Sequence, residues 1–383
     1  MTAPYDPSDR EKVVAKLPLA LRQELKIRAA QLSLDIKDAV TEGINAWRSA
    51  PEGVSPVDTT GGASFSTYLP PGLYEAFKAD CKARSVAYNQ GLAQSIRLWL
   101  DTHTMPKLVR PTQCRRLVVC NQKGGVGKSA VSAGLSQALA EAGARVCVID
   151  FDPQGHLTKH MGQTPLGIKE ASLAKYMLGE AEGNVRDLLI PLEYDTFVGR
   201  LFLLPACKDA FLLDAKLATT RNVRVKETAL EKAVEELEKD FDFILIDCPP
   251  SLGYTMDTAL YFARTRDGED SKASGLVVVV QAEDTSADAY DLLLEQIEDM
   301  EDDLAVSVTQ LGFVVNLYDA RKGFIATSSL SSWEEFGDPP VLVVIPDLKE
   351  QREAVRLKRP LLEYAPDCDQ STAMRNLKKA LTK

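Results

Sequence analysis

The stretch CNQKGGVGKSAVS, residues 120–132, decides the fold of most of this chain. It nearly matches the phosphate-binding loop G-x-x-x-x-G-K-[ST], whose glycines let backbone N–H groups surround a phosphate. The first glycine of that pattern would fall at Gln122, however, and the loop carries an additional lysine, Lys123. The GKS sequence at 127–129 keeps the lysine and the hydroxyl that contact phosphate and Mg²⁺ in such loops. The stretch therefore predicts a nucleotide-binding loop with an altered first half.

The residues around this loop follow the order that a phosphate-binding loop requires. An apolar strand is expected at 117–121, a helix from Lys128 to Glu141 and a second strand at 145–150. Strand, glycine-rich loop, helix and strand in this order predict an α/β domain, a P-loop NTPase with a parallel sheet and helices on both faces. A chance glycine-rich loop is the alternative, and the flanking pattern speaks against it.

The loop and two acidic strand ends supply candidate nucleotide and metal ligands. Lys128 is expected to reach the β- and γ-phosphates, and Ser129 to ligate Mg²⁺. Asp150 and Asp152 in VIDFDPQG, and Asp247 in FDFILIDCPPSLG, stand at the carboxyl ends of expected strands. Ligand sites of parallel sheets gather at that edge. Each aspartate alone could be a helix cap, but together with the loop they predict a site for ATP and Mg²⁺.

KGGVGKS, DFDPQG and IDCPPSLG together resemble the deviant-Walker ATPases of the ParA/MinD family, and most closely the ParA-type partition ATPases, over roughly residues 115–383. The resemblance implies that Lys123 is the signature lysine, which reaches the phosphates of the partner subunit's ATP in a nucleotide-sandwich dimer. It implies that Asp152 orients the attacking water, and that Asp150 and Asp247 support Mg²⁺. Slow hydrolysis of ATP to ADP and phosphate is then the expected reaction.

The resemblance extends to the base pocket. Asn316, in LGFVVNLYDAR, would read the adenine, and Pro346 would close the pocket. The residues expected to bind ATP are Lys123, Gly124, Gly125, Val126, Gly127, Lys128, Ser129, Ala130, Asn316 and Pro346. Those expected to act in catalysis are Lys123, Lys128 and Asp152, and those expected to hold the metal are Ser129, Asp150 and Asp247. Two departures are Val279, where proline is common, and a connection at 262–275 that looks longer than usual.

The N-terminal hundred residues contain an internal repeat. Residues 12–48 and 64–100 superimpose without gaps at an offset of 52, and the linker 49–63 is rich in Pro, Gly, Ser and Thr. Each copy begins with a short alternating run that stops at Leu-Pro, and two helical patterns follow, the second ending at tryptophan. Asp35 is expected to cap the second helix of the first copy. One copy is too small to bury a core, so the copies should pair, within one chain or across two.

This layout resembles the ribbon-helix-helix DNA-binding family, in which two such units pair their strands into a ribbon that enters the major groove. The resemblance implies that the base-contacting side chains are those facing away from the helices: Lys12, Val14, Lys16, Ser64, Ser66 and Tyr68. Those expected to face the core are Val13, Ala15, Phe65 and Thr67. The second copy departs from the family at Ala87, where a capping Ser or Thr is usual. A small dimerisation or protein-interaction module is the alternative.

The expected organisation is a tandem ribbon-helix-helix-like DNA-binding domain at 1–103, a linker at 104–115 and a ParA-type ATPase domain at 116–383. The 383 residues carry a net charge of −10 and are 45% hydrophobic, as in ordinary soluble proteins. No apolar run approaches the ~20 residues that span a bilayer. The N-terminus has no apolar signal segment, and the seven cysteines form no C-x-x-C pair. A cytoplasmic protein with reduced thiols is therefore expected, and the resemblance to ParA-type ATPases implies that it is nucleoid-associated.

The expected function is plasmid or chromosome segregation by an ATP-dependent homodimer that binds DNA nonspecifically. A ParB-like centromere-binding protein would stimulate hydrolysis, and the N-terminal domain would bind an operator. Basic residues from Lys349 onward, including Arg352, Arg356 and Arg375, are candidates for nonspecific DNA contact. The alternatives are a positioning ATPase for a protein cargo and a MinD-like membrane ATPase that uses the apolar face of residues 373–383; membrane binding is the less favoured.

His156 and His160 have the spacing of two residues on one helical face, which a metal could use. A histidine-rich metal centre is not expected, because the chain has only three histidines. A polar surface is the simpler interpretation of this pair.

Overall fold

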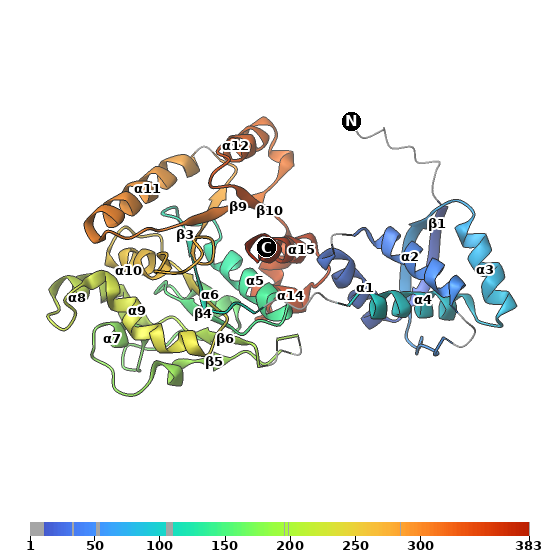
Figure 1. Cartoon of the computed structure of the whole chain (residues 1–383), viewed down its shortest axis with the longest axis horizontal. Coiled ribbons are helices and arrows are strands. Elements are labelled where there is room, and N and C mark those ends of the chain that lie inside the picture. Colours follow the sequence, from blue (N-terminus) through green and yellow to red (C-terminus); the bar gives the residue numbers. More distant parts are fainter. Residues whose placement is uncertain are drawn as a thin grey trace. The chain divides into compact units, whose positions relative to one another are not determined.

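The computed structural model describes residues 11–32, 34–50, 54–104, 110–194, 196–197, 199–283 and 285–382. The chain divides into two units, residues 1–106 and 107–383, each with its own hydrophobic core (Figure 1). Within the described part of the chain, no helix is both long and apolar enough to cross a bilayer.

The N-terminal unit consists of two copies of a strand followed by two helices. The first copy is β1 (Glu11–Leu17), α1 (Leu19–Gln31) and α2 (Ile36–Ser49), and the second is β2 (Ala63–Leu69), α3 (Leu73–Ala83) and α4 (Tyr88–Thr102). The strands pair antiparallel within the one chain, with Val14 opposite Ser66. The ribbon is therefore complete in a single chain.

Burial alternates strictly along both strands of the ribbon. The inward side chains belong to the core of the unit and are Val13, Ala15, Leu17, Phe65, Thr67 and Leu69. The outward side chains are exposed and are Lys12, Val14, Lys16, Ser64, Ser66 and Tyr68. This is the two-residue period of a strand with one buried face, and both sets agree with the orientation predicted from the sequence.

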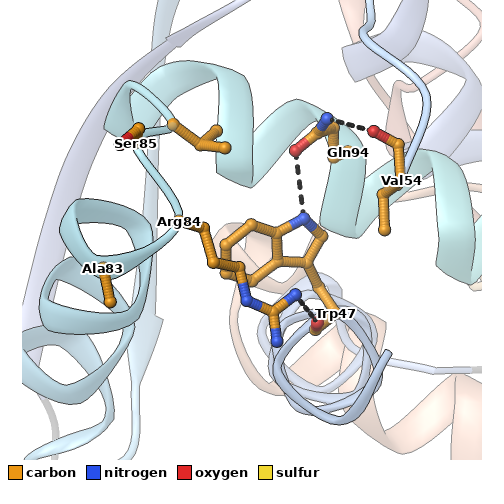
Figure 2. Close-up of a pocket in the computed structure, with 7 residues that line it drawn as sticks. Trp47, Val54, Ala83, Arg84, Ser85 and Gln94 are labelled. Carbon is orange, nitrogen blue, oxygen red and sulfur yellow. Dashed lines mark hydrogen bonds between the residues drawn. The ribbon is translucent and has the colours of Figure 1, made fainter. Parts of the chain in front are cut away.

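The two copies exchange equivalent hydrogen bonds through their helices. The Trp47 indole N–H donates to Gln94 Oε1 at 3.0 Å, and the Trp99 indole N–H donates to Glu42 Oε2 at 2.9 Å. Trp47 and Trp99 are separated by the repeat offset of 52, and so are Glu42 and Gln94. The Gln94 side-chain amide also donates to the Val54 carbonyl at 2.8 Å, and Figure 2 shows it bridging that carbonyl and the indole. The copies are thus related by an approximate two-fold axis.

α2 and α4 pack closely because a glycine lies at their contact. A Cβ at Gly43 would come within 2.7 Å of the Ser95 carbonyl oxygen on α4. Asp35 occupies the N-cap position of α2, as predicted, but its side chain makes no capping bond and instead pairs with Lys37 Nζ at 2.7 Å. The predicted helix start at Asp35 is therefore confirmed, without a capping bond from its side chain.

The C-terminal unit is built on an eight-stranded sheet with the order β10-β9-β8-β3-β7-β4-β6-β5, in which only the β5–β6 pair is antiparallel. The strands are β3 (Arg115–Cys120), β4 (Val146–Asp150), β5 (Ile190–Pro191), β6 (Leu201–Leu204), β7 (Phe243–Asp247), β8 (Gly275–Gln281), β9 (Gln310–Tyr318) and β10 (Val341–Pro346). The central strands are buried along almost their whole length, as expected of a parallel sheet covered on both faces.

Helices cover both faces of this sheet, which confirms the predicted P-loop α/β architecture. They are α5 (Lys128–Glu141), α6 (His156–His160), α7 (Leu173–Met177), α8 (Leu213–Thr219), α9 (Ala229–Val234), α10 (Tyr254–Ala263), α11 (Thr285–Leu304), α12 (Phe324–Glu335), α13 (Lys349–Arg356), α14 (Leu361–Tyr364) and α15 (Asp369–Leu381). Short 3₁₀ turns lie at Val185–Leu188, Lys208–Leu212, Lys226–Thr228, Glu235–Lys239 and Ala320–Lys322. α5 and α15 pack on one face, and α7, α9, α10 and α11 on the other.

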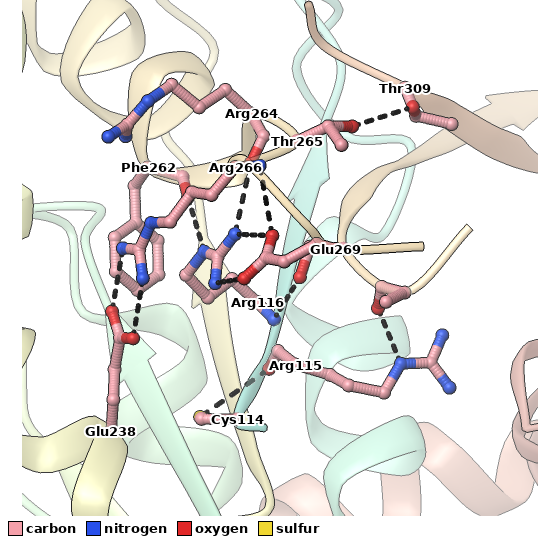
Figure 3. A network of polar contacts seen from close by, with 12 residues as sticks. Cys114, Arg115, Arg116, Glu238, Phe262, Arg264, Thr265, Arg266, Glu269 and Thr309 are labelled. Atoms are coloured by element: carbon pink, nitrogen blue, oxygen red, sulfur yellow. Dashed lines mark hydrogen bonds and ion pairs between the residues drawn. The ribbon is translucent and has the colours of Figure 1, made fainter. Parts of the chain in front are cut away.

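The long connection between α10 and β8 closes a buried ion pair. The Arg116 side chain is 0% exposed, and its two terminal nitrogens donate to the Glu269 carboxylate at 2.8 and 2.6 Å. Its Nε donates to the Phe262 carbonyl at 2.9 Å. Figure 3 shows Arg266 beside it, bound to Glu238. The pair lies at the first residues of β3, at the opposite end of that strand from the glycine-rich loop.

Candidate nucleotide site

The glycine-rich loop connects β3 to α5 and forms a cradle of backbone groups. Gly125 and Gly127 have φ angles of 79° and 90°, in the left-handed region that favours glycine. A Cβ at Gly127 would collide with the Asn316 side chain, whereas Gly124 and Gly125 face open space. The first turn of α5 begins directly after the loop, so its free N–H groups and its dipole favour an anion here.

The two lysines of the loop occupy different positions. Lys128 Nζ donates to the Lys123 carbonyl oxygen at 3.0 Å, which folds Lys128 back over the loop. Burial lowers the pKa of Lys128, and the charge of Asp247 opposes that effect. The Lys123 ammonium instead lies 3.6 Å from Glu283, beyond the end of β8. Glu283 also pairs with Lys322 at 3.4 Å. Lys128 is therefore part of the cradle, and Lys123 contacts a carboxylate outside it.

A buried asparagine fixes the backbone of this loop. Asn121 Oδ1 accepts from the Lys123 backbone N–H at 2.8 Å, and its Nδ2 donates to the Val279 carbonyl at 2.6 Å. Val279 thus contributes its backbone oxygen to the support of the loop. Asn316, on β9, donates from its Nδ2 to the Val126 carbonyl at 2.8 Å. The side-chain amides of Asn121 and Asn316 thus connect the loop to the sheet by hydrogen bonds.

Two buried carboxylates face each other across neighbouring strands. Asp150 on β4 is in register with Asp247 on β7. Asp247 accepts from the Ser132 hydroxyl at 3.0 Å, and Asp150 accepts from the backbone N–H and the hydroxyl of Thr158 at 2.7 and 2.6 Å. The second oxygen of each carboxylate is buried without a hydrogen-bond partner. Burial raises the pKa of both groups, and the charge of Asp247 adds to the rise at Asp150.

Two unsatisfied carboxylate oxygens beside a hydroxyl fit a hard divalent cation. The Ser129 side chain acts to lower the pKa of the Asp247 carboxyl, so its hydroxyl lies near the same place. Oxygen ligands from one or two carboxylates, completed by water and substrate phosphates, are the usual surroundings of Mg²⁺ in nucleotide sites. A bound cation would also relieve the cost of two buried acids, since it favours their charged forms.

A cavity of about 520 Å³ opens at the loop, a size typical of small-molecule sites. Its walls include seven of the predicted residues: Gly124, Gly125, Gly127, Lys128, Ser129, Ala130 and Asp152. Asp152 accepts from the Gln154 backbone N–H at 2.9 Å, which holds its carboxylate at this wall. The other predicted residues do not line it. Lys123, Asp150 and Asp247 lie around it, and Val126 and Asn316 support the loop from the sheet side.

Pro346 ends β10, three places from β3 in the strand order, and its carbonyl accepts from Gln370 Nε2 at 3.1 Å. It is not among the residues of this cavity. The roles predicted for Asn316 and Pro346 in binding the base stay predictions.

The cavity is also lined by residues that the sequence analysis did not assign to the nucleotide site. His156 and His160 on α6, Phe211 and Pro250 line it. Burial, with a smaller effect from His156, lowers the pKa of His160 to about 4, so this imidazole is neutral at pH 7. His156 is exposed, as the polar-surface interpretation expects, and His160 is half-buried at the cavity wall. A signal existed for Pro250, which follows the strand end at Asp247, but none marked the 56%-exposed Phe211.

The basic C-terminal residues do not form one accessible set. Arg375 is 2% exposed and binds the Glu141 carboxylate through two nitrogens at 2.6 and 2.7 Å. The prediction that it contacts DNA is therefore wrong, because its charge is neutralised inside the fold. Lys349 and Arg352 are exposed and pair with carboxylates at 3.3 and 3.2 Å.

The apolar side chains of α15 are buried in the same way. Met374 and Leu377 pack against α5, so they are not available to a membrane surface. This removes the feature on which the membrane alternative rested.

Comparison with known proteins supports this assignment of the loop. The AAA domain family matches residues 114–309. The chromosome-partitioning ATPase Soj of Thermus thermophilus is 30% identical over 263 residues, 69% of this chain and 93% of that protein. The chromosome partitioning protein ParA of Caulobacter vibrioides is 29% identical over 261 residues, 68% and 90% respectively.

Among solved structures, cobyrinic acid a,c-diamide synthase from Mycobacterium smegmatis with bound ATP analog and magnesium is 30% identical. It covers 68% of this chain and 91% of its own, with a TM-score of 0.53. That structure has the same fold and contains an ATP analog and magnesium, the two ligands that the cavity and its carboxylates suit.

Proposed function

The chain belongs to the ParA/MinD family of P-loop ATPases, and from this premise we propose that it is a DNA-partitioning ATPase whose nucleotide state controls self-association. It hydrolyses ATP and requires Mg²⁺, as its family does. The observation that carries the proposal is the position of Lys123, whose ammonium lies at Glu283 while Lys128 covers the cradle. A lysine directed away from its own site is suited to a second subunit.

The residues around the cavity have different roles in ATP hydrolysis. The backbone of 124–129 and Lys128 would bind the phosphates, and Ser129, Asp150 and Asp247 would hold Mg²⁺. When bound, Mg²⁺ neutralises charge on the phosphate oxygens. Asp152 orients the attacking water, because its carboxylate lies at the cavity wall, where the Gln154 backbone N–H holds it.

Self-association follows from the charge of the nucleotide. ATP brings about four negative charges to the cradle, and a lysine from the facing subunit neutralises part of them. Lys123 of each subunit would then contact the phosphates of the other, so that loss of the γ-phosphate weakens the dimer. The dimer would bind DNA nonspecifically on the nucleoid, within the cytoplasm. A ParB-like centromere-binding protein is the proposed partner that accelerates hydrolysis.

The N-terminal unit is proposed to bind an operator as a ribbon-helix-helix domain. Support comes from the antiparallel ribbon, the outward lysines Lys12 and Lys16, and the reciprocal tryptophan hydrogen bonds that make two copies one domain. The major groove is wide enough for a two-stranded ribbon, and lysine on its outer face suits guanine O6 and N7. The 1–103 boundary is part of this proposal.

Binding to random DNA and to the chain's own promoter DNA, with ATP, with ADP and without nucleotide, tests the division of labour. Lys128→Ala should abolish ATP-dependent binding to random DNA and leave promoter binding intact. The pair Lys12→Ala and Lys16→Ala should do the reverse, and Lys82→Ala on the exposed side of α3 is the matched control. If both kinds of binding fall together in either variant, the proposed separation is refuted.

A further inference from the structure

The outward face of the ribbon is not symmetric, although the fold beneath it nearly is. The repeat offset of 52 relates Lys12 to Ser64, Val14 to Ser66, and Lys16 to Tyr68. At none of these three positions do the two strands carry the same residue. In the core, by contrast, Leu17 and Leu69 match, and so do Trp47 and Trp99.

From this contrast we propose that one chain, acting alone, reads a DNA site without two-fold symmetry through the six outward side chains of β1 and β2. This rests on the proposed function of the N-terminal unit as a DNA-binding domain. A ribbon made from two identical strands presents the same residues in both directions and therefore favours a palindrome. Here the pairing is internal to the chain, so the two halves of the ribbon are free to differ.

The chemistry of the two strands says what each half would recognise. β1 presents two lysines, which bind the acceptors O6 and N7 of guanine, and Val14, which is 59% exposed and suits the methyl group of thymine. β2 presents two serines, which discriminate little between bases, and Tyr68, which is 47% exposed. The bases that contact β1 should therefore be more strongly specified than those that contact β2.

The register places these groups along the groove. Lys12 lies opposite Tyr68 at one end of the ribbon, Lys16 lies opposite Ser64 towards the other end, and Val14 faces Ser66 between them. Among the six outward side chains, each end thus has one cation, from β1. In the described part of the chain neither lysine forms a salt bridge, so both charges are available to the duplex.

Selection from a duplex library tests this with the full chain and no nucleotide. The library is randomised over about two helical turns, ~20 base pairs. The enriched site should lack two-fold symmetry and should bind one chain, as measured by native mass spectrometry. Two palindromes, each made from one half of the enriched site and its inverted copy, should bind at least about tenfold more weakly, because each mismatched base pair commonly costs that much.

A symmetrised variant gives the second arm. Ser64→Lys, Ser66→Val and Tyr68→Lys together give β2 the outward residues of β1. All three positions are exposed, so the fold should persist, which circular dichroism checks. The variant should now bind a palindrome more tightly than the original asymmetric site, because both ends of its ribbon carry the same residues, whereas Lys82→Ser on α3 should leave the original preference unchanged.

The outcomes separate this inference from the proposal beneath it. A palindromic enriched site, or an asymmetric site whose preference the triple variant does not change, overturns the inference and leaves DNA binding standing. No enrichment of any sequence overturns DNA recognition by this unit, and the inference with it.

Discussion

Arg116→Met should destabilise the C-terminal unit strongly without touching the nucleotide site. The substitution removes both charge-assisted hydrogen bonds to Glu269, whose side chain is 8% exposed, and leaves the Phe262 carbonyl without its donor. Methionine fills much of the space that the arginine stem occupied. The dominant effect is therefore a carboxylate buried without its partner.

The size of the stability loss follows from the unpaired, buried Glu269 carboxylate. Removing one member of a buried ion pair commonly costs about 3–5 kcal/mol. For a unit of this size each kcal/mol lowers the midpoint of thermal unfolding by roughly 2–4 °C, so a fall on the order of 10 °C is expected. Adding Glu269→Leu removes the orphaned charge and should recover at least half of the loss, because the pair itself contributes little against an apolar replacement.

Differential scanning calorimetry of the full chain can measure this, since its two units can give separate transitions. Only the transition that ATP and Mg²⁺ shift upward should respond to Arg116→Met. Lys272→Met, in the exposed part of the same connection, is the matched control and should shift it by less than about 2 °C. The reasoning would be refuted if Arg116→Met shifted the midpoint no more than this control, or if Glu269→Leu made the loss larger.

Three further predictions concern other parts of the molecule. Lys123→Ala should keep ATP binding but lose ATP-driven dimerisation, as measured by light scattering, whereas Glu283→Gln should strengthen dimerisation up to about fivefold by weakening the ion pair between Glu283 and the partly exposed Lys123; intact dimerisation in Lys123→Ala contradicts the proposed role. Gly43→Val should lower the stability of the N-terminal unit by about 1–3 kcal/mol through overpacking against α4 and leave ATP turnover unchanged, and equal loss in both units would count against it. Because the folded-state pKa of His160 is about 4, below the 6.5 of the free side chain, the unfolded chain takes up a proton first as the pH falls. Stability should therefore decline from pH 6.5 towards 4, and less so in His160→Gln; identical pH profiles would exclude this origin.

The features predictable from the sequence are those set by local pattern. The helix after the loop begins at Lys128 and ends at Glu141 as predicted, because the glycines before it and the turn at Gly143 bound a helix-favouring run. The strict alternation of β1 and β2 determined which six side chains point outward. The internal repeat also indicated that the two copies share a core. It did not indicate whether the two copies that pair belong to one chain or to two.

The remaining features depend on contacts between segments far apart in the sequence. Arg375 looks like an exposed base until Glu141, 234 positions away, is placed against it. His160 and Phe211 reach the nucleotide cavity from separate connections, and neither carries a motif. Asp35 occupies a capping position, but a nearby lysine competes for its carboxylate. The sequence pattern indicates which face of a helix or strand is polar. It does not indicate which distant segment packs against that face.

Because β1 pairs with β2 inside one polypeptide, folding of the N-terminal unit does not depend on protein concentration. A ribbon assembled from separate chains comes apart on dilution, because its folded state is tied to protomer concentration. Here the segment 49–63 tethers the halves, and short tethers maintain local concentrations in the millimolar range. A cell holding only a handful of copies would still contain fully formed ribbons. A low copy number would therefore limit how many DNA sites are occupied, but not whether the ribbon is folded.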